Sequence, residues 1–397
     1  MLNFRFISPT EIYFGKDTER FCGEAVKKHG GSRVLIIHGT GSAVRSGLLD
    51  RVCQSLAENG LHFQIEGGVV ANPRDEKAAE LVRVAVDKKL DFVLGVGGGS
   101  VLDTAKAVAV GALSPATPLW DFFSYKVPVE KALPVGSVMT FPATGSEASP
   151  SSVLNFAGPG LKRGLGSDLI RPVFAVLNPE LTYTLSPYQT ACGIVDMMSH
   201  LLERYFSNTP HVDVTDRLCE GLLKSIMDAA RGWLKNPNDY ESRAALMWAS
   251  TLAHNNVAGV GREQDWACHA LEHELSYRYD VAHGAGLAVI TIAWMRYVAP
   301  LAPAKLCRFA VEVLGLPAKF EDPVNLALAG TRRLAAFFHE IGMPLTFEEL
   351  GGDPADIPAL TQTVKRLSHG KAGNYVPLDD AAIKAVYRLS LAENAVF

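Results

Sequence analysis

The pattern of hydrophobic and polar positions changes near residue 185. Before it, short apolar runs alternate with amphipathic segments. The apolar runs cover residues 34–37, 92–96, 135–141 and 174–177, and segments such as 76–88 and 101–111 repeat apolar residues at helical spacing. Apolar runs without alternation are typical of strands buried on both faces, and strands that alternate with helices are typical of a parallel sheet. We therefore predict an α/β domain over residues 1–184.

The second half of the chain has a different pattern, in which the strand signal fades. Helical periodicity covers residues 187–207, 213–234, 240–258, 266–277 and 284–298, with Pro or Gly in most of the gaps. No internal repeat or long linker interrupts the chain. We predict a helical domain over residues 185–397, so the fold class is α/β plus all-α.

Composition narrows the function classes. Lys and Arg number 38 against 42 Asp and Glu, a net charge of −4, whereas general nucleic-acid binders are basic. The six cysteines contain no CxxC pair, which is typical of free thiols in a reducing compartment. The chain has neither a signal-peptide pattern at its start nor a long uncharged apolar stretch. We expect a cytoplasmic protein with no nucleic-acid or membrane partner.

Glycine-containing turns follow three of the predicted strands, where ligands of open parallel sheets bind. The turn Gly97–Ser100 precedes a predicted helix, and glycines there let a backbone approach a pyrophosphate at the helix amino end. A tight strand-to-helix turn can also need glycine for packing alone. The tip after the first predicted strand, residues 38–42, has no carboxylate to repel a 2′-phosphate and has Arg45 just behind it. If a dinucleotide binds, this tip favours NADPH, with NADH as the alternative.

Five residues indicate a metal site. Asp196 and His200 share a face of a largely apolar predicted helix, and so do His269 and His273 on another. His283 follows ten residues later, at a turn. Asp196 and His200 alone could be a helix cap and a packed core histidine, but the histidine cluster beside them favours a divalent metal. Imidazoles with one carboxylate suit Fe²⁺ or Zn²⁺, and the ligand types do not separate the two.

A zinc metallopeptidase is an alternative interpretation of the same segment. His269-x-x-Glu272-His273 matches the H-x-x-E-H pattern, in which both histidines bind zinc and the glutamate is the general base. A later acidic ligand would come from Glu340, Glu348 or Glu349. This interpretation gives Asp196, the other histidines and the glycine-rich turns no role.

Several motifs together resemble the iron-containing (group III) alcohol dehydrogenases. They are Gly97-Gly98-Gly99-Ser100-x-x-Asp103-Thr104-x-Lys106, Ala143-Thr144-Gly145-Ser146-Glu147, Asp196-x-x-x-His200 and His269-(x)13-His283. Segments 172–177, 264–267 and 271–275 are similar to the branch of NADPH-dependent butanol dehydrogenases and broad-specificity aldehyde reductases. The resemblance runs from Phe4 to beyond Leu350 and implies a Rossmann-like dinucleotide-binding domain followed by a helical metal-binding domain. Dehydroquinate synthase shares this plan, but it needs a dense set of Lys and Arg that the apolar helices here do not offer.

The resemblance also implies roles for individual residues. The implied metal ligands are Asp196, His200, His269 and His283, while His273 faces the nicotinamide and substrate and is the candidate proton donor. The implied cofactor contacts are Gly39, Thr40, Gly41, Ser42, Asn72, Gly98, Gly99, Ser100, Thr140, Thr144, Ser146, Lys162 and Thr182. Lys162 would lie near the adenosine ribose; its alternative is a solvated lysine beside Arg163.

One position departs from the branch. Ser149 stands near the expected nicotinamide site, where members usually carry Asn, and Pro150 stiffens the backbone after it. This departure bears on substrate preference and not on the class of reaction. The sequence therefore predicts a metal-dependent NAD(P)H alcohol dehydrogenase or aldehyde reductase that acts on a small alcohol or aldehyde, and the resemblance suggests a homodimer.

Overall fold

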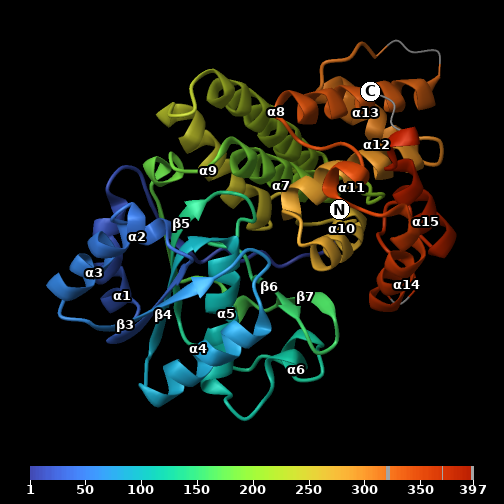
Figure 1. The fold of residues 1–397 in the computed structure, drawn as a ribbon. Helices are drawn as coiled ribbons and strands as arrows, with labels where there is room; N and C mark the ends of the chain where they lie inside the picture. Colours follow the sequence, from blue (N-terminus) through green and yellow to red (C-terminus); the bar gives the residue numbers. More distant parts are fainter. Residues whose placement is uncertain (319–321, 369, 395–397) are drawn as a thin grey trace. The chain divides into compact units, whose positions relative to one another are not determined.

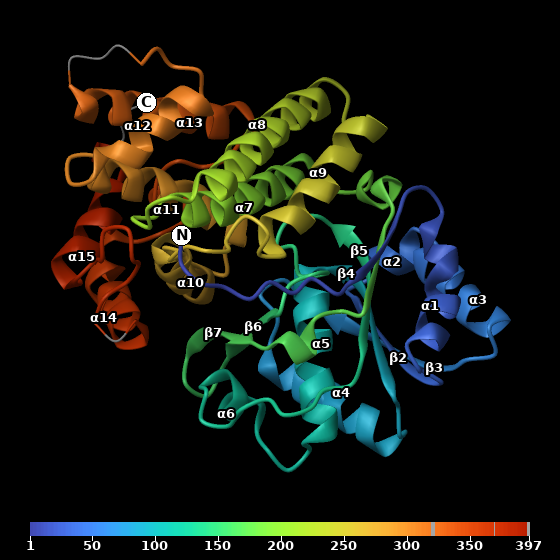
Figure 2. The same cartoon turned by 180° about the vertical axis from the view of Figure 1, so that it is seen from behind.

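The computed structural model describes residues 1–318, 322–368 and 370–394 (Figures 1 and 2). The chain forms two compact units. One contains Ile7–Leu185 and Asn238–Asn255; the other contains Met1–Phe6, Ser186–Pro237 and, as far as it is described, Asn256–Phe397. A single cut after residue 184 differs from this division in two places, because the first six residues lie with the helical unit and a later helix lies with the α/β unit.

The α/β unit is built on a parallel six-stranded sheet in the order β1-β8-β5-β4-β2-β3. Its strands are β1 (Glu11–Phe14), β2 (Arg33–Gly39), β3 (His62–Val69), β4 (Phe92–Gly98), β5 (Val135–Phe141) and β8 (Phe174–Leu177). The predicted α/β fold is confirmed, and β1 and β3 are strands that the sequence pattern did not indicate. An antiparallel hairpin, β6 (Ser151–Phe156) with β7 (Leu161–Gly166), lies outside the sheet and was also not predicted.

Helices cover both faces of this sheet (Figure 1). They are α1 (Cys22–Lys28), α2 (Ser42–Arg45), α3 (Leu48–Glu58), α4 (Asp75–Asp87), α5 (Gly99–Leu113) and α6 (Leu119–Phe123), with 3-10 turns η1 (Thr18–Phe21), η2 (Asp168–Ile170) and η3 (Pro179–Thr182). Val34 and Ile36 pack into one core with α1 and α3, whereas Leu35 and Ile37 pack into another with α4 and α5. Alternate side chains of a strand point to opposite faces, so an uninterrupted apolar run serves both cores.

Helix α9 (Tyr240–His254) packs within the α/β unit, although the sequence pattern placed it in the helical half. Met247 joins a small core with Leu102 and Met139. Gly145 has φ +60°, and a Cβ there would lie 2.6 Å from the His254 Cβ and 2.7 Å from the Ser250 carbonyl oxygen. The chain therefore needs a glycine after Thr144 so that this turn can lie directly on α9.

The helical unit contains eight helices among its described residues. They are α7 (Pro187–Tyr205), α8 (Asp213–Lys235), α10 (Ala267–Tyr279), α11 (His283–Val298), α12 (Pro303–Glu312), α13 (Pro323–Glu340), α14 (Ile357–Leu367) and α15 (Asp380–Leu389), with turns η4 (Glu348–Leu350), η5 (Pro354–Asp356) and η6 (Ala392–Asn394). A capping box between Ser186 and Gln189 begins α7. Helix α7 packs against α8 and α11, and α10 packs against α11. Among the described helices, none combines the length and hydropathy that a membrane crossing requires.

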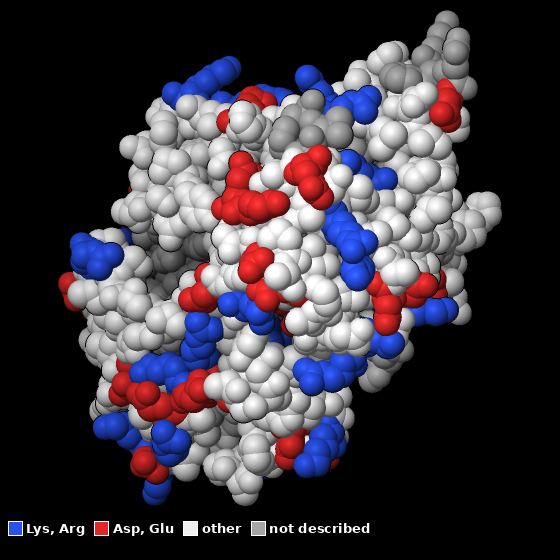
Figure 3. All heavy atoms as spheres, turned by 45° about the vertical axis from the view of Figure 1, so that its right-hand side comes forward, with Lys and Arg blue, Asp and Glu red and all other residues white. Residues whose placement is uncertain are grey.

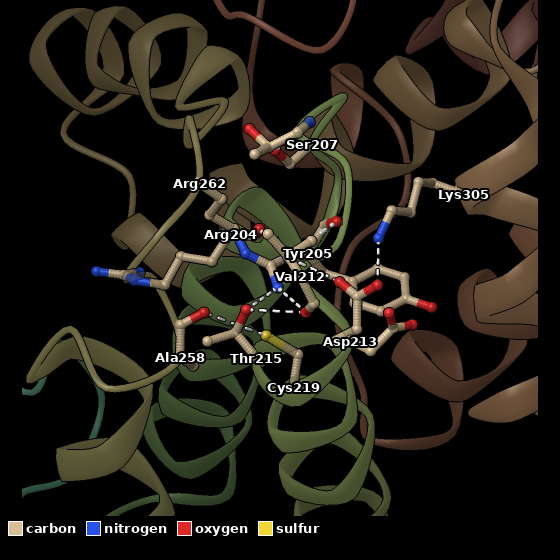
Figure 4. Close-up of polar contacts among 12 residues, drawn as sticks. Arg204, Tyr205, Ser207, Val212, Asp213, Thr215, Cys219, Ala258, Arg262 and Lys305 are labelled. Carbon is tan, nitrogen blue, oxygen red and sulfur yellow. Dashed lines mark hydrogen bonds and ion pairs between the residues drawn. The ribbon is translucent and has the colours of Figure 1, made fainter. Parts of the chain in front are cut away.

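A buried cluster of charges supports the chain between α7 and α8. The Arg262 side chain is fully buried, and its Nη1 lies 2.9 Å from Asp216 Oδ1. The same guanidinium donates hydrogen bonds to the carbonyls of Arg204 and Val212 and to the Thr215 hydroxyl (Figure 4). Asp216 also pairs with Lys305 and with Arg308. One arginine thus joins the end of α7, the connection after it and the start of α8.

The surface carries charges of both signs. On the face drawn in Figure 3, basic and acidic side chains lie beside one another and do not gather into one large patch of either sign. All six cysteines are free thiols, as the sequence analysis expected.

Candidate metal centre and cofactor site

Three helices of the helical unit bring four possible metal ligands together. Asp196 and His200 lie one turn apart on α7, His269 lies in the first turn of α10, and His283 is the first residue of α11. Asp196 Oδ1 lies 3.4 Å from His200 Nδ1, 3.9 Å from His269 Nε2 and 3.9 Å from His283 Nε2. One carboxylate oxygen is therefore within 4 Å of a nitrogen from each of three imidazoles.

This geometry fits a divalent metal ion. Donor atoms at about 2.1 Å from a shared ion, at tetrahedral angles, are about 3.4 Å apart. The Nε2 atom of His269 is buried, and among the described residues it has no hydrogen-bond partner. Such an atom is costly to bury unless something binds it. Three imidazoles with one carboxylate are a donor set that suits Fe²⁺ or Zn²⁺.

Two buried glutamates orient two of these histidines. Glu203 Oε2 bonds His269 Nδ1, and Glu272 Oε2 bonds His283 Nδ1. Glu203 Oε1 also accepts the backbone N–H of Cys268 at 2.6 Å. Each of these histidines therefore keeps its Nε2 lone pair available for a metal ion on the side of Asp196, an arrangement common around protein-bound metals. Burial alone lowers the pKa of His269, but the nearby Glu203 carboxylate raises it on balance.

The sequence pattern did not indicate the orienting role of either glutamate. Glu203 lies three residues after His200, on the helix face that carries Asp196, so its spacing was a usable signal. For Glu272 the sequence pattern indicates only the general base of a peptidase. One of its carboxylate oxygens bonds His283, and the other accepts the Ser276 hydroxyl. With both oxygens engaged, Glu272 is not placed to activate a water, which argues against the peptidase interpretation.

His273 lies one turn beyond His269 on α10 and is half-buried. Its ring centroid is 5.5 Å from that of His283 and 6.3 Å from that of His269. One possible ligand atom each of Glu272, His273 and His283 lies within 4.8 Å of the others. His273 thus lies beside the four-residue cluster.

Gly284 determines how closely α11 approaches α7. A Cβ on Gly284 would lie 2.0 Å from the Cys192 carbonyl oxygen, so alanine forces the two helix backbones apart. Because His283 is the adjacent residue, we expect Gly284→Ala to lower metal affinity at least tenfold, about 1.4 kcal/mol or more. Metal content at a fixed free Fe²⁺ or Zn²⁺ concentration measures this.

A matched control is Gly221→Ala on α8, where a Cβ meets no atom within 4 Å. That variant should bind metal as the unmodified chain does and be slightly more stable, since alanine is the better helix former. Equal metal content in the two variants would show that the close approach at Gly284 is not needed.

The α/β unit gathers the glycine-rich turn and the residues after β5. No side chain caps the first turn of α5, where Gly99 and Ser100 lie. A Cβ on Gly99 would lie 2.6 Å from Thr144 Oγ1, and that hydroxyl oxygen accepts the Ser146 backbone N–H at 3.2 Å. A Cβ on Gly98 would likewise lie too close to a neighbour, 2.9 Å from Phe141 Cβ. The turn therefore needs glycine for packing, and it also leaves an uncapped helix amino end of the kind that binds phosphate.

A second group lies at the ends of β2 and β3. Residues Gly39–Ser42 form the turn from β2 to α2, and the Arg45 guanidinium lies over Gly41, where a Cβ would be 2.8 Å from Arg45 Nη1. Lys162 Nζ donates to Asn72 Oδ1 at 3.3 Å, and both side chains are buried. The interpretation of Lys162 as a solvated surface residue is therefore wrong.

Three predicted residues have less accessible positions. The Thr182 hydroxyl is buried and donates to the Pro179 carbonyl within η3. Ser149 is also buried, and its Oγ lies 3.4 Å from Lys106 Nζ. Thr140 is half-buried near the end of β5, next to the residue that pairs with Gly98. Ser149 thus faces the interior of its own loop.

Glu274, on α10, gives a pH-dependent test of the helical unit. Burial raises the pKa of Glu274 to about 7. The native state thus favours the protonated form, and its contribution to stability is present below pH 4.5 and is lost as the pH rises through 7. We expect Glu274→Gln to raise the free energy of unfolding by about 1–3 kcal/mol at pH 8 and to change it little at pH 5. Denaturant unfolding at both pH values, with the exposed Glu263→Gln as control, measures this; an equal effect at the two values would contradict it.

Comparison with known proteins places this geometry in a family. The model of the iron-containing alcohol dehydrogenase family matches residues 9–179, and the C-terminal model of that family matches residues 190–391. The chain is 35% identical to NADH-dependent butanol dehydrogenase A of Clostridium acetobutylicum over 391 residues, covering 98% of this chain and 100% of that protein. It is 36% identical to the NADPH-dependent aldehyde reductase YqhD of Escherichia coli over 373 residues, covering 93% and 94%.

Solved structures agree. The crystal structure of NADH-dependent butanol dehydrogenase A from Thermotoga maritima matches with a TM-score of 0.95 at 37% identity, over 98% of this chain and 99% of that one. The family models cover both units, and the relatives align over nearly their whole length. The chain belongs to the iron-containing alcohol dehydrogenase family.

Proposed function

We propose that this chain is a metal-dependent oxidoreductase that interconverts primary alcohols and aldehydes with a nicotinamide cofactor, preferring NADPH. The observation that carries the proposal is the convergence of three imidazoles on Asp196 Oδ1, in a chain whose relatives include butanol dehydrogenases and an aldehyde reductase. The dehydroquinate synthase-like alternative lacks such support, because no relative named above carries that activity.

Asp196, His200, His269 and His283 would hold the metal. When bound, the metal would polarise a carbonyl oxygen and the nicotinamide would supply the hydride. The chain's own contribution is to hold the imidazoles in place, through Glu203 on His269 and Glu272 on His283. Fixed ligands need no rearrangement during the reaction, which is the advantage of a preorganised site.

His273 is the proposed proton donor to the product alkoxide. It is half-buried, lies one helical turn from His269 and has its ring centroid 5.5 Å from that of His283. Histidine titrates near neutral pH, so it can hold and release a proton under working conditions. In alcohol oxidation the His273 imidazole would take up the proton.

The proposed preference for NADPH is supported by the tip after β2. Arg45 lies over Gly41, and the turn from Gly39 to Ser42 carries hydroxyl and amide groups but no carboxylate. A cation there can pair with a 2′-phosphate, whereas NAD sites usually place a carboxylate near the ribose hydroxyls. Relatives of both kinds occur, since one is named as NADH-dependent and another as NADPH-dependent.

The test of the proposed function is steady-state oxidation of NADPH and of NADH with butanal. We expect kcat/KM to be at least tenfold higher with NADPH. Arg45→Ala should lower kcat/KM for NADPH about tenfold and leave that for NADH within twofold, since the removed pair is worth about 1.4 kcal/mol. Equal or better use of NADH by the unmodified chain would overturn the cofactor preference, and no oxidation of either cofactor with any primary aldehyde would overturn the reaction.

A homodimer is the proposed assembly. Among the described strands, β1 pairs only with β8, so the other edge of β1 is unpaired, and Phe14 at its end is 40% exposed. Unpaired strand edges with apolar side chains pair readily with a second chain. Light scattering of the purified protein distinguishes a dimer from the 42.8 kDa monomer.

A further inference from the structure

Lys106 is a fully buried lysine on α5 that the proposed reaction does not use. Lysine is rarely buried completely, because an ammonium group loses its hydration when it leaves water. The α5 helix begins at Gly99, in the turn proposed to bind pyrophosphate, and Lys106 lies two turns further along it. The Lys106 side chain therefore links the helix of the proposed cofactor site to the groups that its ammonium contacts.

All the partners of this ammonium lie in one short loop. Lys106 Nζ donates to Ser146 Oγ at 2.8 Å, to the Ser149 carbonyl at 3.0 Å and to the Ser151 carbonyl at 2.7 Å. An ammonium group has three N–H donors, so these acceptors satisfy it. The loop that they define, residues 146–151, follows β5 and leads into β6. We call it the serine loop.

A second residue of α5 holds the same segment. Asp103 Oδ1 accepts the Ser146 hydroxyl at 2.7 Å, and Oδ2 accepts the Val153 backbone N–H at 3.1 Å. The Ser146 hydroxyl therefore receives from Lys106 and donates to Asp103. One face of α5 thus fixes both ends of the serine loop.

The charges around Lys106 come from three directions. Asp103 lies on its own helix, Glu147 lies in the serine loop, and Arg171 donates to the Ala148 carbonyl from the segment before β8. Burial lowers the pKa of Lys106 to about 8, against the opposing effect of the two carboxylates. Glu147 is itself buried and accepts the Thr251 hydroxyl from α9. The serine loop is therefore held by contacts from α5, from α9 and from the segment before β8.

The order of strands shows which part of a dinucleotide this loop would meet. The glycine-rich turn follows β4, the tip with Arg45 follows β2 on one side of it, and the serine loop follows β5 on the other side. A dinucleotide with its adenosine at β2 and its pyrophosphate at β4 extends its nicotinamide toward β5. The serine loop therefore corresponds to the nicotinamide half.

We propose that Lys106 is a positioning residue that fixes the serine loop, and through it the nicotinamide half of the cofactor site, without touching the cofactor itself. The inference rests on the proposed function, because it needs the α/β unit to bind a nicotinamide dinucleotide. Lysine suits this role, since three donors at one point meet three acceptors of one loop. Methionine has a similar shape but leaves those acceptors unsatisfied.

The test compares binding of NADPH with binding of 2′-phospho-ADP-ribose, which lacks the nicotinamide. In Lys106→Met we expect NADPH to bind at least tenfold more weakly and 2′-phospho-ADP-ribose to bind within threefold of the unmodified chain. The kcat with butanal should fall at least tenfold, and metal content should stay the same. Lys106→Gln keeps two donors, so its NADPH affinity should lie between those of the unmodified chain and Lys106→Met.

A matched control is Lys162→Met, the other buried lysine of this unit, which bonds Asn72 on the adenosine side. It should weaken both ligands alike. Unchanged NADPH affinity and kcat in Lys106→Met would overturn the proposal, and so would an equal loss for both ligands. If Lys106→Met does not fold, the same comparison in Lys106→Gln decides. An unmodified chain that binds neither ligand would instead overturn the proposed function.

Discussion

His269→Ala is expected to lose bound metal and alcohol–aldehyde activity together, whereas His273→Ala is expected to keep the metal and lose rate. His269 Nε2 is buried, lies 3.9 Å from Asp196 Oδ1 and has no hydrogen-bond partner among the described residues, so it is placed to bind the ion. We expect metal content to fall below a tenth of that of the unmodified chain and kcat/KM to fall by a factor of about 10³ or more. Metal analysis and steady-state kinetics on the same preparation measure both.

Comparing the metal content of His269→Ala with that of His273→Ala tests the assignment of the metal ligands. That variant should bind metal normally, and its kcat should fall by a factor of about 10² or more, the usual contribution of a general acid. Release of metal by His273→Ala would contradict the assignment of His283 and His269 over His273. Asp196→Ala is the matching positive control and should behave as His269→Ala does, because Asp196 Oδ1 lies within 4 Å of all three imidazoles.

Of the substitutions proposed for this protein, Arg262→Ala is expected to lower the free energy of unfolding most. The arginine side chain is fully buried. Its removal takes one cation from Asp216, which keeps Lys305 and Arg308, and leaves two backbone carbonyls without this donor (Figure 4). Each buried carbonyl left without a donor costs about 1–3 kcal/mol, so with the weakened pairing of Asp216 we expect a loss of about 3–5 kcal/mol. Denaturant unfolding, followed by a signal from the helical unit, measures this loss.

Arg217→Ala is the control for this prediction. Arg217 pairs with Glu220 and Glu312 at the edge of the same cluster, but its side chain is 60% exposed. Exposed ion pairs contribute about 0–1 kcal/mol, so its loss should be small. Similar losses for the two arginines would show that burial does not determine the contribution of this cluster.

Much of the sheet could be predicted from local patterns, and the metal cluster from local spacing together with the family resemblance, which selects His283 over His273. The apolar runs that became β2, β4, β5 and β8 are long enough to stand out. The spacing of Asp196 and His200 places them on one helix face in any helix, and the same holds for His269 and His273. The predicted helix ends are also close to the observed ones. For example, the pattern predicts a helix over residues 213–234, and α8 covers Asp213–Lys235.

What the sequence did not reveal depends on tertiary packing. Helix α9 has the same periodicity as its neighbours, and tertiary contacts such as those with Gly145, Leu102 and Glu147 place it in the α/β unit. The hairpin β6–β7 has little apolar alternation in its second strand. Two of the groups that accept hydrogen bonds from Lys106 are backbone carbonyls, which have no sequence signature. The role of a buried charge therefore depends on tertiary contacts that are visible only in the folded chain.

The most direct test of the proposed reaction is NADPH oxidation with butanal before chelation, after chelation, and after adding back Fe²⁺ or Zn²⁺ separately. We expect chelation to abolish aldehyde-dependent oxidation and one of the two metals to restore it, because the cluster of Asp196 with His200, His269 and His283 fits a divalent ion. NADPH binding should persist throughout, since the proposed cofactor residues belong to the other unit. Full activity in a preparation shown to be free of metal would contradict the account.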